Sequence, residues 1–169
     1  MKSRTVECED VVELVPRLLN LQKILVPIDF SETSKKALQY AVRFAEQFGC
    51  EIVLLNVVEP VTLMVGAPLA IEVFPDTNDD LGSVKRKLGT LAAQRRTSRA
   101  DSIDTEVRSG HAPNEIIKAA RDWDVDLIVI ATHGCTSWRH FCIGSTAERV
   151  VRSAPCPVLV VREKEHEFV

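Results

Sequence analysis

The sequence lacks a strong excess of charge of either sign, and this limits the partners that it is suited to bind. Its 169 residues include 21 Lys and Arg against 24 Asp and Glu, which gives a formal net charge of −3. Domains that bind nucleic acids usually present a basic face to the phosphates. We therefore expect no nucleic acid among the partners of this chain.

The first twenty residues also lack a continuous apolar run, because Glu7, Glu9, Asp10 and Glu13 interrupt them. A secretory signal needs such a run, so export is not expected. The five cysteines are odd in number and mostly lie among apolar residues, which suits reduced thiols better than a disulfide framework. These features favour a cytoplasmic protein that does not contact a membrane.

The composition is that of an ordinary globular domain. Hydrophobic residues make up 46% of the chain and charged residues 27%, unlike a disordered or membrane-spanning chain. A length of 169 residues suits one domain with a single core.

Four short apolar runs predict strands that are mostly buried in a sheet, and residues 105–107 support a further, shorter strand. The segments between them place apolar residues at helical spacing, with Ser31 as the expected N-cap of the first helix and Gly49 as its stop. The expected strands cover residues 23–28, 52–58, 105–107, 127–131 and 158–161, and the expected helices lie within residues 31–48, 84–92, 113–120 and 145–152. Residues 59–80 are expected to form a long loop.

This alternation of strands and helices predicts an α/β fold. Right-handed crossovers between successive strands give a parallel sheet with helices on both faces. We predict a three-layer doubly wound sheet of five parallel strands in the order 3-2-1-4-5. The domain is expected over residues 21–162, with residues 1–20 as an extension that is helical or disordered and residues 163–169 as a C-terminal tail.

In a sheet of this order the first and fourth strands are neighbours whose helices leave toward opposite faces. This arrangement creates a crevice at the carboxyl ends of the two strands, where ligands bind in open α/β sheets. Two segments meet there, residues 27–31 after the first strand and residues 131–146 after the fourth. The sequence therefore predicts a ligand site at this edge of the sheet.

The residue types in these two segments suit a nucleotide. Gly144 allows a ligand to approach the backbone closely, and the helix after it presents the N–H groups of Ser145, Thr146 and Ala147 to an anion. Asp29 lies across the crevice, where a carboxylate accepts hydrogen bonds from ribose hydroxyls. The alternative is purely structural, with a helix cap at residues 29–31 and an ordinary turn at residues 144–145.

Three segments of the sequence resemble the universal stress protein domain: ILVPIDFSETSKKAL, GHAPNEIIKAA and IATHGCTSWRHFCIGSTAERVVRSAPCPVLVV. The resemblance extends from about Leu21 to Arg162. The ATP-binding branch of that family carries a Gly, two residues, a second Gly, nine residues, and then Gly with Ser or Thr. In this chain the same register gives Ala131, Gly134, Gly144 and Ser145, so Ala131 adds one methyl group where the family has its first glycine.

The resemblance implies a site for ATP, with or without Mg²⁺. Pro27, Asp29 and Val57 would line the adenosine part, beside Ala131. Gly134, Gly144, Ser145 and Thr146 would hold the phosphates. It also implies a regulatory homodimer that acts in a stress response. The apolar fifth strand is expected at an edge of the sheet, where pairing with a second copy would cover it.

Two other functions remain open at this point. A slow ATPase or an enzyme that phosphorylates itself on Ser145 or Thr146 is one, although the chain lacks a Walker A motif and the glycine-rich serine loop of ATP pyrophosphatases. An interaction scaffold without a ligand is the other, and Ala131 favours it. We expect binding rather than turnover, because the carboxylates and the base of a phosphoryl-transfer site are incomplete.

Two H-x-C pairs, His133 with Cys135 and His140 with Cys142, have the ligand chemistry of a tetrahedral zinc site. Their spacing is not a usual zinc signature, and Cys142 lies in an apolar run. A response of these cysteines to oxidants is a further possibility that requires exposure and a low pKa. We favour loop and core roles for the four residues and expect no bound metal.

Overall fold

The computed structural model describes residues 21–64, 70–73, 78–95, 102–132 and 143–163. Five of its strands form a parallel sheet in the order β5-β2-β1-β6-β7. They are β1 (Lys23–Pro27), β2 (Glu51–Val58), β5 (Ile103–Ser109), β6 (Leu127–Ala131) and β7 (Val158–Val161). Taken in chain order these are the first to fifth strands of the sheet, so the predicted order 3-2-1-4-5 is confirmed.

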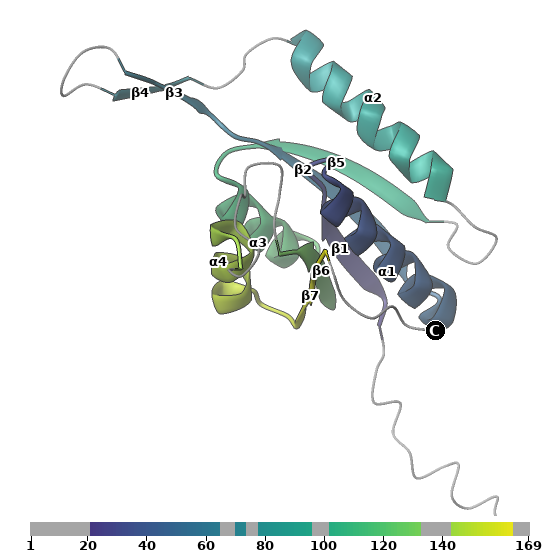
Figure 1. Cartoon of the computed structure of the whole chain (residues 1–169). Helices are drawn as coiled ribbons and strands as arrows, with labels where there is room; N and C mark the ends of the chain where they lie inside the picture. Colours follow the sequence, from purple (N-terminus) through teal and green to yellow (C-terminus); the bar gives the residue numbers. More distant parts are fainter. Residues whose placement is uncertain (1–20, 65–69, 74–77, 96–101, 133–142, 164–169) are drawn as a thin grey trace, which may run out of the picture.

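Four helices cover the two faces of this sheet (Figure 1). They are α1 (Glu32–Phe48), α2 (Asn78–Arg95), α3 (Ala112–Asp122) and α4 (Ser145–Ser153). Buried side chains of α1 and α2 share one core cluster with residues of the sheet, whereas those of α3 and α4 share a second cluster. The molecule therefore has the predicted three layers, with a core on each side of the sheet.

The ends of α1 follow the predicted capping chemistry. The side chain of Ser31 accepts a hydrogen bond from the Ser34 N–H at 3.1 Å, and Gly49 adopts φ 70° while its N–H donates to the Ala45 carbonyl at 2.8 Å. The cap satisfies one N–H at the start of the helix, and glycine adopts the left-handed conformation at its end without steric cost. Both predicted ends of the first helix are confirmed.

The prediction of one long loop over residues 59–80 is wrong. The strands β3 (Val61–Met64) and β4 (Ala70–Val73) pair in antiparallel register, and α2 already begins at Asn78. Each strand has four residues, which is too short a run for a pattern of alternating burial to stand out in the sequence. Figure 1 shows this pair extending away from the five-stranded sheet.

The third strand of the sheet is longer than predicted, because β5 runs from Ile103 to Ser109. It is an edge strand, and polar residues such as Asp104 and Glu106 alternate with less exposed ones. Such alternation lacks the continuous apolar run that identifies a central strand. In the part of the chain that the structure describes, no helix is both long and apolar enough to cross a membrane.

Candidate functional site

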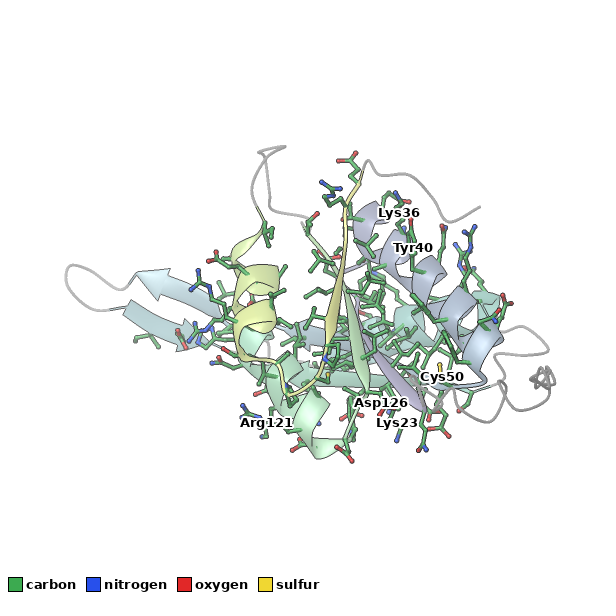
Figure 2. All side chains as sticks on the ribbon, turned by 90° about the horizontal axis from the view of Figure 1, so that it is seen from below. Lys23, Lys36, Tyr40, Cys50, Arg121 and Asp126 are labelled. Carbon is green, nitrogen blue, oxygen red and sulfur yellow. The ribbon has the colours of Figure 1, made fainter. Side chains whose placement is uncertain are left out.

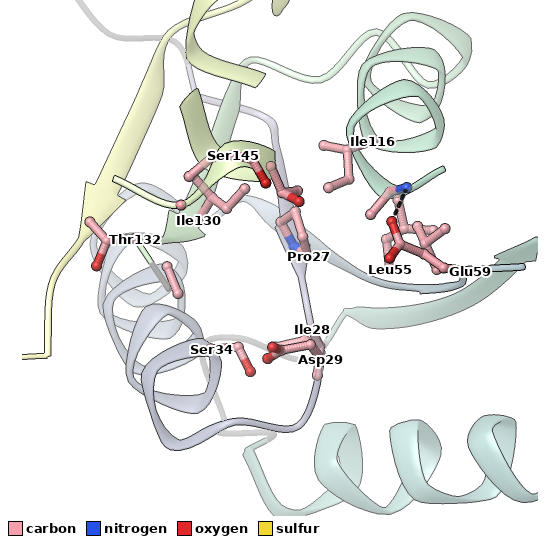
Figure 3. A pocket seen from close by; sticks show the side chains of 16 residues that line it. Pro27, Ile28, Asp29, Ser34, Leu55, Glu59, Ile116, Ile130, Thr132 and Ser145 are labelled. Atoms are coloured by element: carbon pink, nitrogen blue, oxygen red, sulfur yellow. Dashed lines mark hydrogen bonds between the residues drawn. The ribbon is translucent and has the colours of Figure 1, made fainter. Parts of the chain in front are cut away.

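A cavity of about 300 Å³ lies at the carboxyl ends of β1 and β6 (Figure 3). β1 pairs with β2 from Lys23 to Pro27, but its pairing with β6 is confined to Ile24↔Leu127 and Leu25↔Ile128, near the start of both strands. The two strands therefore separate before they end. This is the position that the strand order predicts for a ligand crevice.

The cavity brings together every predicted site residue that the structure describes. Those lining it are Pro27, Asp29, Val57, Ala131, Gly144, Ser145 and Thr146. The eighth predicted residue, Gly134, lies outside the described residues. Segments that are more than a hundred residues apart in the sequence thus line the same cavity.

Further residues line the cavity that sequence reasoning did not assign to it. Leu55, Ile116 and Ile130 form apolar wall, and Ser34 and Glu59 add polar groups. The sequence does not distinguish Leu55, Ile116 and Ile130 from core residues, because a buried apolar residue gives the same pattern whether or not it borders a cavity. Glu59 directly follows β2, so its place at the carboxyl end of a central strand was a usable signal.

The segment that carries Asp29 is held in place by β2. The Ile28 N–H donates to the Leu55 carbonyl at 2.8 Å, and the side-chain amide of Asn56 donates to the Ile28 carbonyl at 2.6 Å. Asn56 is 8% exposed, so this hydrogen bond is made away from water, where losing it is costly. The chain beyond the last residue of β1 is therefore fixed at the edge of the cavity.

Asp29 is itself oriented by the start of α1. Its Oδ1 accepts hydrogen bonds from the Ser31 N–H at 3.0 Å and from the Ser31 hydroxyl at 2.5 Å. Phe30 between them adopts φ 65°, an uncommon conformation for a bulky residue. Residues 29–31 therefore do form the helix cap that the sequence allowed as an alternative. The same cap holds the exposed carboxylate of Asp29 at the cavity, so the structural role and the position at the cavity are compatible.

The opposite wall is the beginning of α4. The Gly144 N–H donates to the Thr132 carbonyl at 2.8 Å, and its carbonyl accepts from the Glu148 N–H at 2.9 Å. Helix geometry leaves the N–H groups of Ser145, Thr146 and Ala147 without acceptors inside the helix. Gly144 has φ −59°, which any residue adopts, so its backbone conformation does not require glycine. What glycine provides at this wall is the absence of a side chain. The wall therefore offers N–H donors and the positive end of a helix dipole.

Glu59 links the cavity to α3. Its Oε1 accepts a hydrogen bond from the Ala112 N–H at 2.9 Å, shown as the dashed line in Figure 3. His111 occupies the N-cap position of α3 and makes no capping bond with its side chain, so Glu59 supplies an acceptor from another part of the chain. The start of α3, with Ala112 and Ile116, is thereby held against the cavity.

The charges around the cavity are divided between its walls. Asp29 and Glu59 place carboxylates at the ends of β1 and β2, while the start of α4 offers N–H groups. Among the described residues that line the cavity there is no Lys or Arg. A bound anion would therefore be held in this part of the site by backbone N–H and hydroxyl groups rather than by cationic side chains.

Cys50 and Cys156 lie at the other end of the sheet from the cavity, beside Asp126 (Figure 2 labels Cys50 and Asp126). Both are free thiols. Burial, and to a smaller extent the Asp126 carboxylate, raises the pKa of each thiol. These two cysteines are therefore protonated at neutral pH and poorly suited to react with oxidants.

The residues of the zinc hypothesis, His133, Cys135, His140 and Cys142, lie outside the described residues. Within the described ranges, no three His, Cys, Asp or Glu side chains are grouped so that they could hold a metal ion. The expectation of no bound metal stays a prediction.

Comparison with known proteins finds a matching family profile and relatives that carry the same family name. The profile of the universal stress protein family matches residues 20–162. A universal stress protein of Methanocaldococcus jannaschii is 33% identical over 150 residues, which covers 86% of this chain and 85% of the relative.

Solved structures share the fold over most of their length. Universal stress protein UspA from Lactobacillus plantarum has a TM-score of 0.69 and 26% identity, covering 85% of this chain and 99% of that chain. A universal stress protein from Archaeoglobus fulgidus, solved in complex with dAMP, has a TM-score of 0.60 and covers 85% of this chain and 99% of its own. Its identity is 19%, so this likeness concerns the fold. With the family profile, the sequence relative and the fold in agreement, the chain belongs to the universal stress protein family.

Proposed function

We propose that this protein binds an adenine nucleotide, with ATP as the preferred ligand, in the cavity at the carboxyl ends of β1 and β6. The observation that carries this proposal is that Asp29 and the start of α4 line the same cavity. A ribose hydroxyl suits the carboxylate and a phosphate suits the helix start. A volume of about 300 Å³ lies at the lower end of the range for ligand pockets.

In this arrangement the base lies against apolar wall. Pro27, Val57 and Ile116 supply apolar surface to the cavity, and Asp29 accepts hydrogen bonds from the ribose. Gly144, Ser145 and Thr146 hold the phosphates, together with Gly134 from the segment before them. The dAMP bound by the Archaeoglobus fulgidus relative supports the wider class, an adenine nucleotide. ATP with or without Mg²⁺ is the narrower part of the proposal.

The methyl group of Ala131 is the one departure from the family's glycine pattern in the described part of the site. Ala131 lines the cavity, at the end of β6, and is half-buried. It takes up space beside the ligand but does not replace an N–H donor at the start of α4. The Ala131 methyl group therefore favours a site that binds nucleotide more weakly. A scaffold without a ligand would require the site to be lost.

Nucleotide binding is proposed to regulate the protein rather than to feed a reaction. Phosphoryl transfer needs metal-binding carboxylates, a positioned base and cationic groups around the phosphates. The described lining holds Asp29 and Glu59 as its carboxylates, and both already accept hydrogen bonds from the backbone. This supports a regulatory role in a stress response, in which partner proteins respond to whether the cavity holds a nucleotide. Slow hydrolysis or self-phosphorylation is the alternative.

The regulatory unit is proposed to be a cytoplasmic homodimer that pairs through β7. This strand is an edge of the sheet, and Val158, Leu159 and Val160 are all partly exposed. An edge strand with apolar side chains is normally covered or paired with another strand. The intracellular pool of adenine nucleotides is consistent with a cytoplasmic location.

Purification without added nucleotide tests the binding proposal. The protein is denatured, and the released small molecules are separated by chromatography and assayed for phosphate. We expect adenine nucleotide in the released fraction, or an increase in melting temperature when ATP is added to empty protein, because a ligand that binds only the folded state stabilises it. Protein that releases no nucleotide and whose melting temperature does not respond to ATP contradicts the proposal.

A further inference from the structure

A second hollow of about 450 Å³ lies between the first turn of α1 and the exposed side of α2. We call it the basic groove. Phe30 and Lys35 form one side, and six residues of α2 form the other: Ser83, Arg86, Lys87, Thr90, Leu91 and Gln94. Asp29 lines the nucleotide cavity, whereas its neighbour Phe30 lines this groove. Figure 3 shows α2 beyond the turn that carries Asp29. The groove is within the size range of small-molecule sites and shares no lining residue with the nucleotide cavity.

Three cationic side chains line the basic groove, Lys35 from α1 and Arg86 and Lys87 from α2. None of the described residues that line it is acidic. Lys35 pairs with Glu32 at 2.7 Å, but the Glu32 side chain is 88% exposed, so water screens this pair. Across the described part of the chain, neither Arg86 nor Lys87 pairs with a carboxylate. The groove therefore carries an excess of positive charge.

The groove also has an apolar part. Leu91 is 9% exposed and belongs to the core, while Phe30 is half-buried and packs against the same cluster. Phe30 holds a left-handed conformation with φ 65°, which is unfavourable for an aromatic residue. The turn that orients Asp29 does not by itself need an aromatic side chain at this position. Phe30 therefore packs against the core with part of its side chain and presents apolar surface to the groove.

We propose that the basic groove binds a small phosphate monoester that carries an apolar group. The phosphate would pair with Arg86 and Lys87, since a guanidinium offers two parallel donors and an ammonium a compact positive charge. The apolar group would lie against Phe30 and Leu91. Inorganic phosphate lacks the apolar part and would bind more weakly. This site is separate from the nucleotide cavity, and the proposal does not depend on nucleotide binding.

Phenyl phosphate is the probe that tests the proposal. It is titrated into the full chain, and the backbone amides are followed by ¹H–¹⁵N NMR with and without saturating ATP. We expect saturable shifts at Phe30 and at Arg86 to Leu91, in both conditions, with inorganic phosphate binding several-fold more weakly. The double substitution Arg86→Gln with Lys87→Gln should weaken phenyl phosphate binding about tenfold, because two charge-assisted contacts are lost.

Lys85→Gln is the matched control, because Lys85 is an exposed cation on the same helix that does not line the groove. It should bind the probe as the parent does. The proposal is overturned if the shifts cluster at residues 144–147, if no saturable shift appears, or if Lys85→Gln weakens binding as much as the double variant. All variants are exposed-surface changes on α2, and unchanged amide spectra elsewhere show that they fold.

Discussion

At the residue scale, Asp29 combines a structural task with a proposed binding task. It accepts two hydrogen bonds from Ser31, and it lines the cavity between β1 and β6. A carboxylate held in this way loses little freedom when a ribose binds, which favours affinity. Asp29 therefore belongs both to the helix cap and to the proposed ligand site. A variant at this position must be tested for folding as well as for binding.

We predict that Asp29→Ala weakens ATP binding by about 1–3 kcal/mol, the range for lost hydrogen bonds to a charged group. Isothermal titration with ATP and with 2′-deoxy-ATP measures the loss. The parent should prefer ATP, and the variant should lose that preference. Asp29→Asn is the control that keeps an acceptor for Ser31 without the charge. A folded Asp29→Ala variant that binds ATP as the parent does contradicts the ribose assignment.

We predict that the two described cysteines make the stability of the fold depend on pH. Burial raises the pKa of the Cys50 and Cys156 thiols, so the unfolded chain releases their protons at lower pH than the folded protein does. The stability that they contribute is present below the unfolded pKa of about 8.5 and falls as the pH rises above it.

Urea denaturation at about pH 7.5 and pH 9.5, either side of the ordinary thiol pKa, measures this effect. The parent should lose more unfolding free energy between the two pH values than a variant with Cys50→Ala and Cys156→Ala. Equal losses in the two proteins would show that these thiols do not titrate differently in the folded and unfolded states.

At the scale of single elements, the end of β1 depends on a buried hydrogen bond. The side-chain amide of Asn56 in β2 donates to the carbonyl of Ile28, and nothing in the apolar run around Asn56 predicts that partner. The sequence predicts that a strand lies here, but not which backbone group of a neighbouring strand the amide reaches, because that depends on register. Sequence reasoning therefore placed Asp29 at the cavity without finding what holds it there.

We predict that Asn56→Ala lowers the free energy of unfolding by about 1–3 kcal/mol, because it leaves the buried Ile28 carbonyl without this donor. Denaturant unfolding measures the loss. Asn114→Ala, at an exposed position on α3, is the matched control and should change stability by less than about 0.5 kcal/mol. Similar effects for the two substitutions would show that the Asn56 bond does not stabilise the end of β1.

Elements marked by a continuous apolar run or by helical spacing of apolar residues were predictable, and short elements without either signal were not. The bounds of β6 and β7 were predicted to the residue, since each is a continuous apolar run. The pair β3 and β4 was missed, because four-residue strands outside the main sheet leave no long alternating pattern. Glu59 was missed as a site residue although it directly follows β2, at the carboxyl end of a central strand. Its hydrogen bond with the Ala112 N–H was not predictable, because it joins positions 53 residues apart.

At the scale of the whole molecule, the sheet order determines where the crevice lies and, among the described strands, puts β7 at an edge. The crevice arises because β1 and β6 are neighbours whose helices cover opposite faces. The edge arises because β7 ends the sheet on one side. The chain after β7 is tied to the body, since Lys36 Nζ donates to the carbonyls of Arg162 and Glu163 at 3.3 and 3.1 Å.

We predict that the intact chain is a dimer in solution, because pairing of two copies of β7 would cover this apolar edge. Sedimentation velocity at micromolar concentration measures the state of assembly. Val160→Lys places a charge on the strand and should shift the population toward monomer, whereas the exposed substitution Arg121→Gln on α3 should not. A parent protein that sediments only as a monomer rules out this assembly.

The central claim, that the cavity between β1 and β6 binds ATP, is tested most directly by calorimetric titration of ATP into Gly144→Val. The backbone at Gly144 accepts a side chain, so the variant should fold, but a branched side chain at the phosphate wall should reduce affinity at least tenfold. Gly89→Val, whose added Cβ meets nothing within 4 Å on α2, is the control and should bind as the parent does. Folded Gly144→Val protein that binds ATP with parental affinity would contradict the claim.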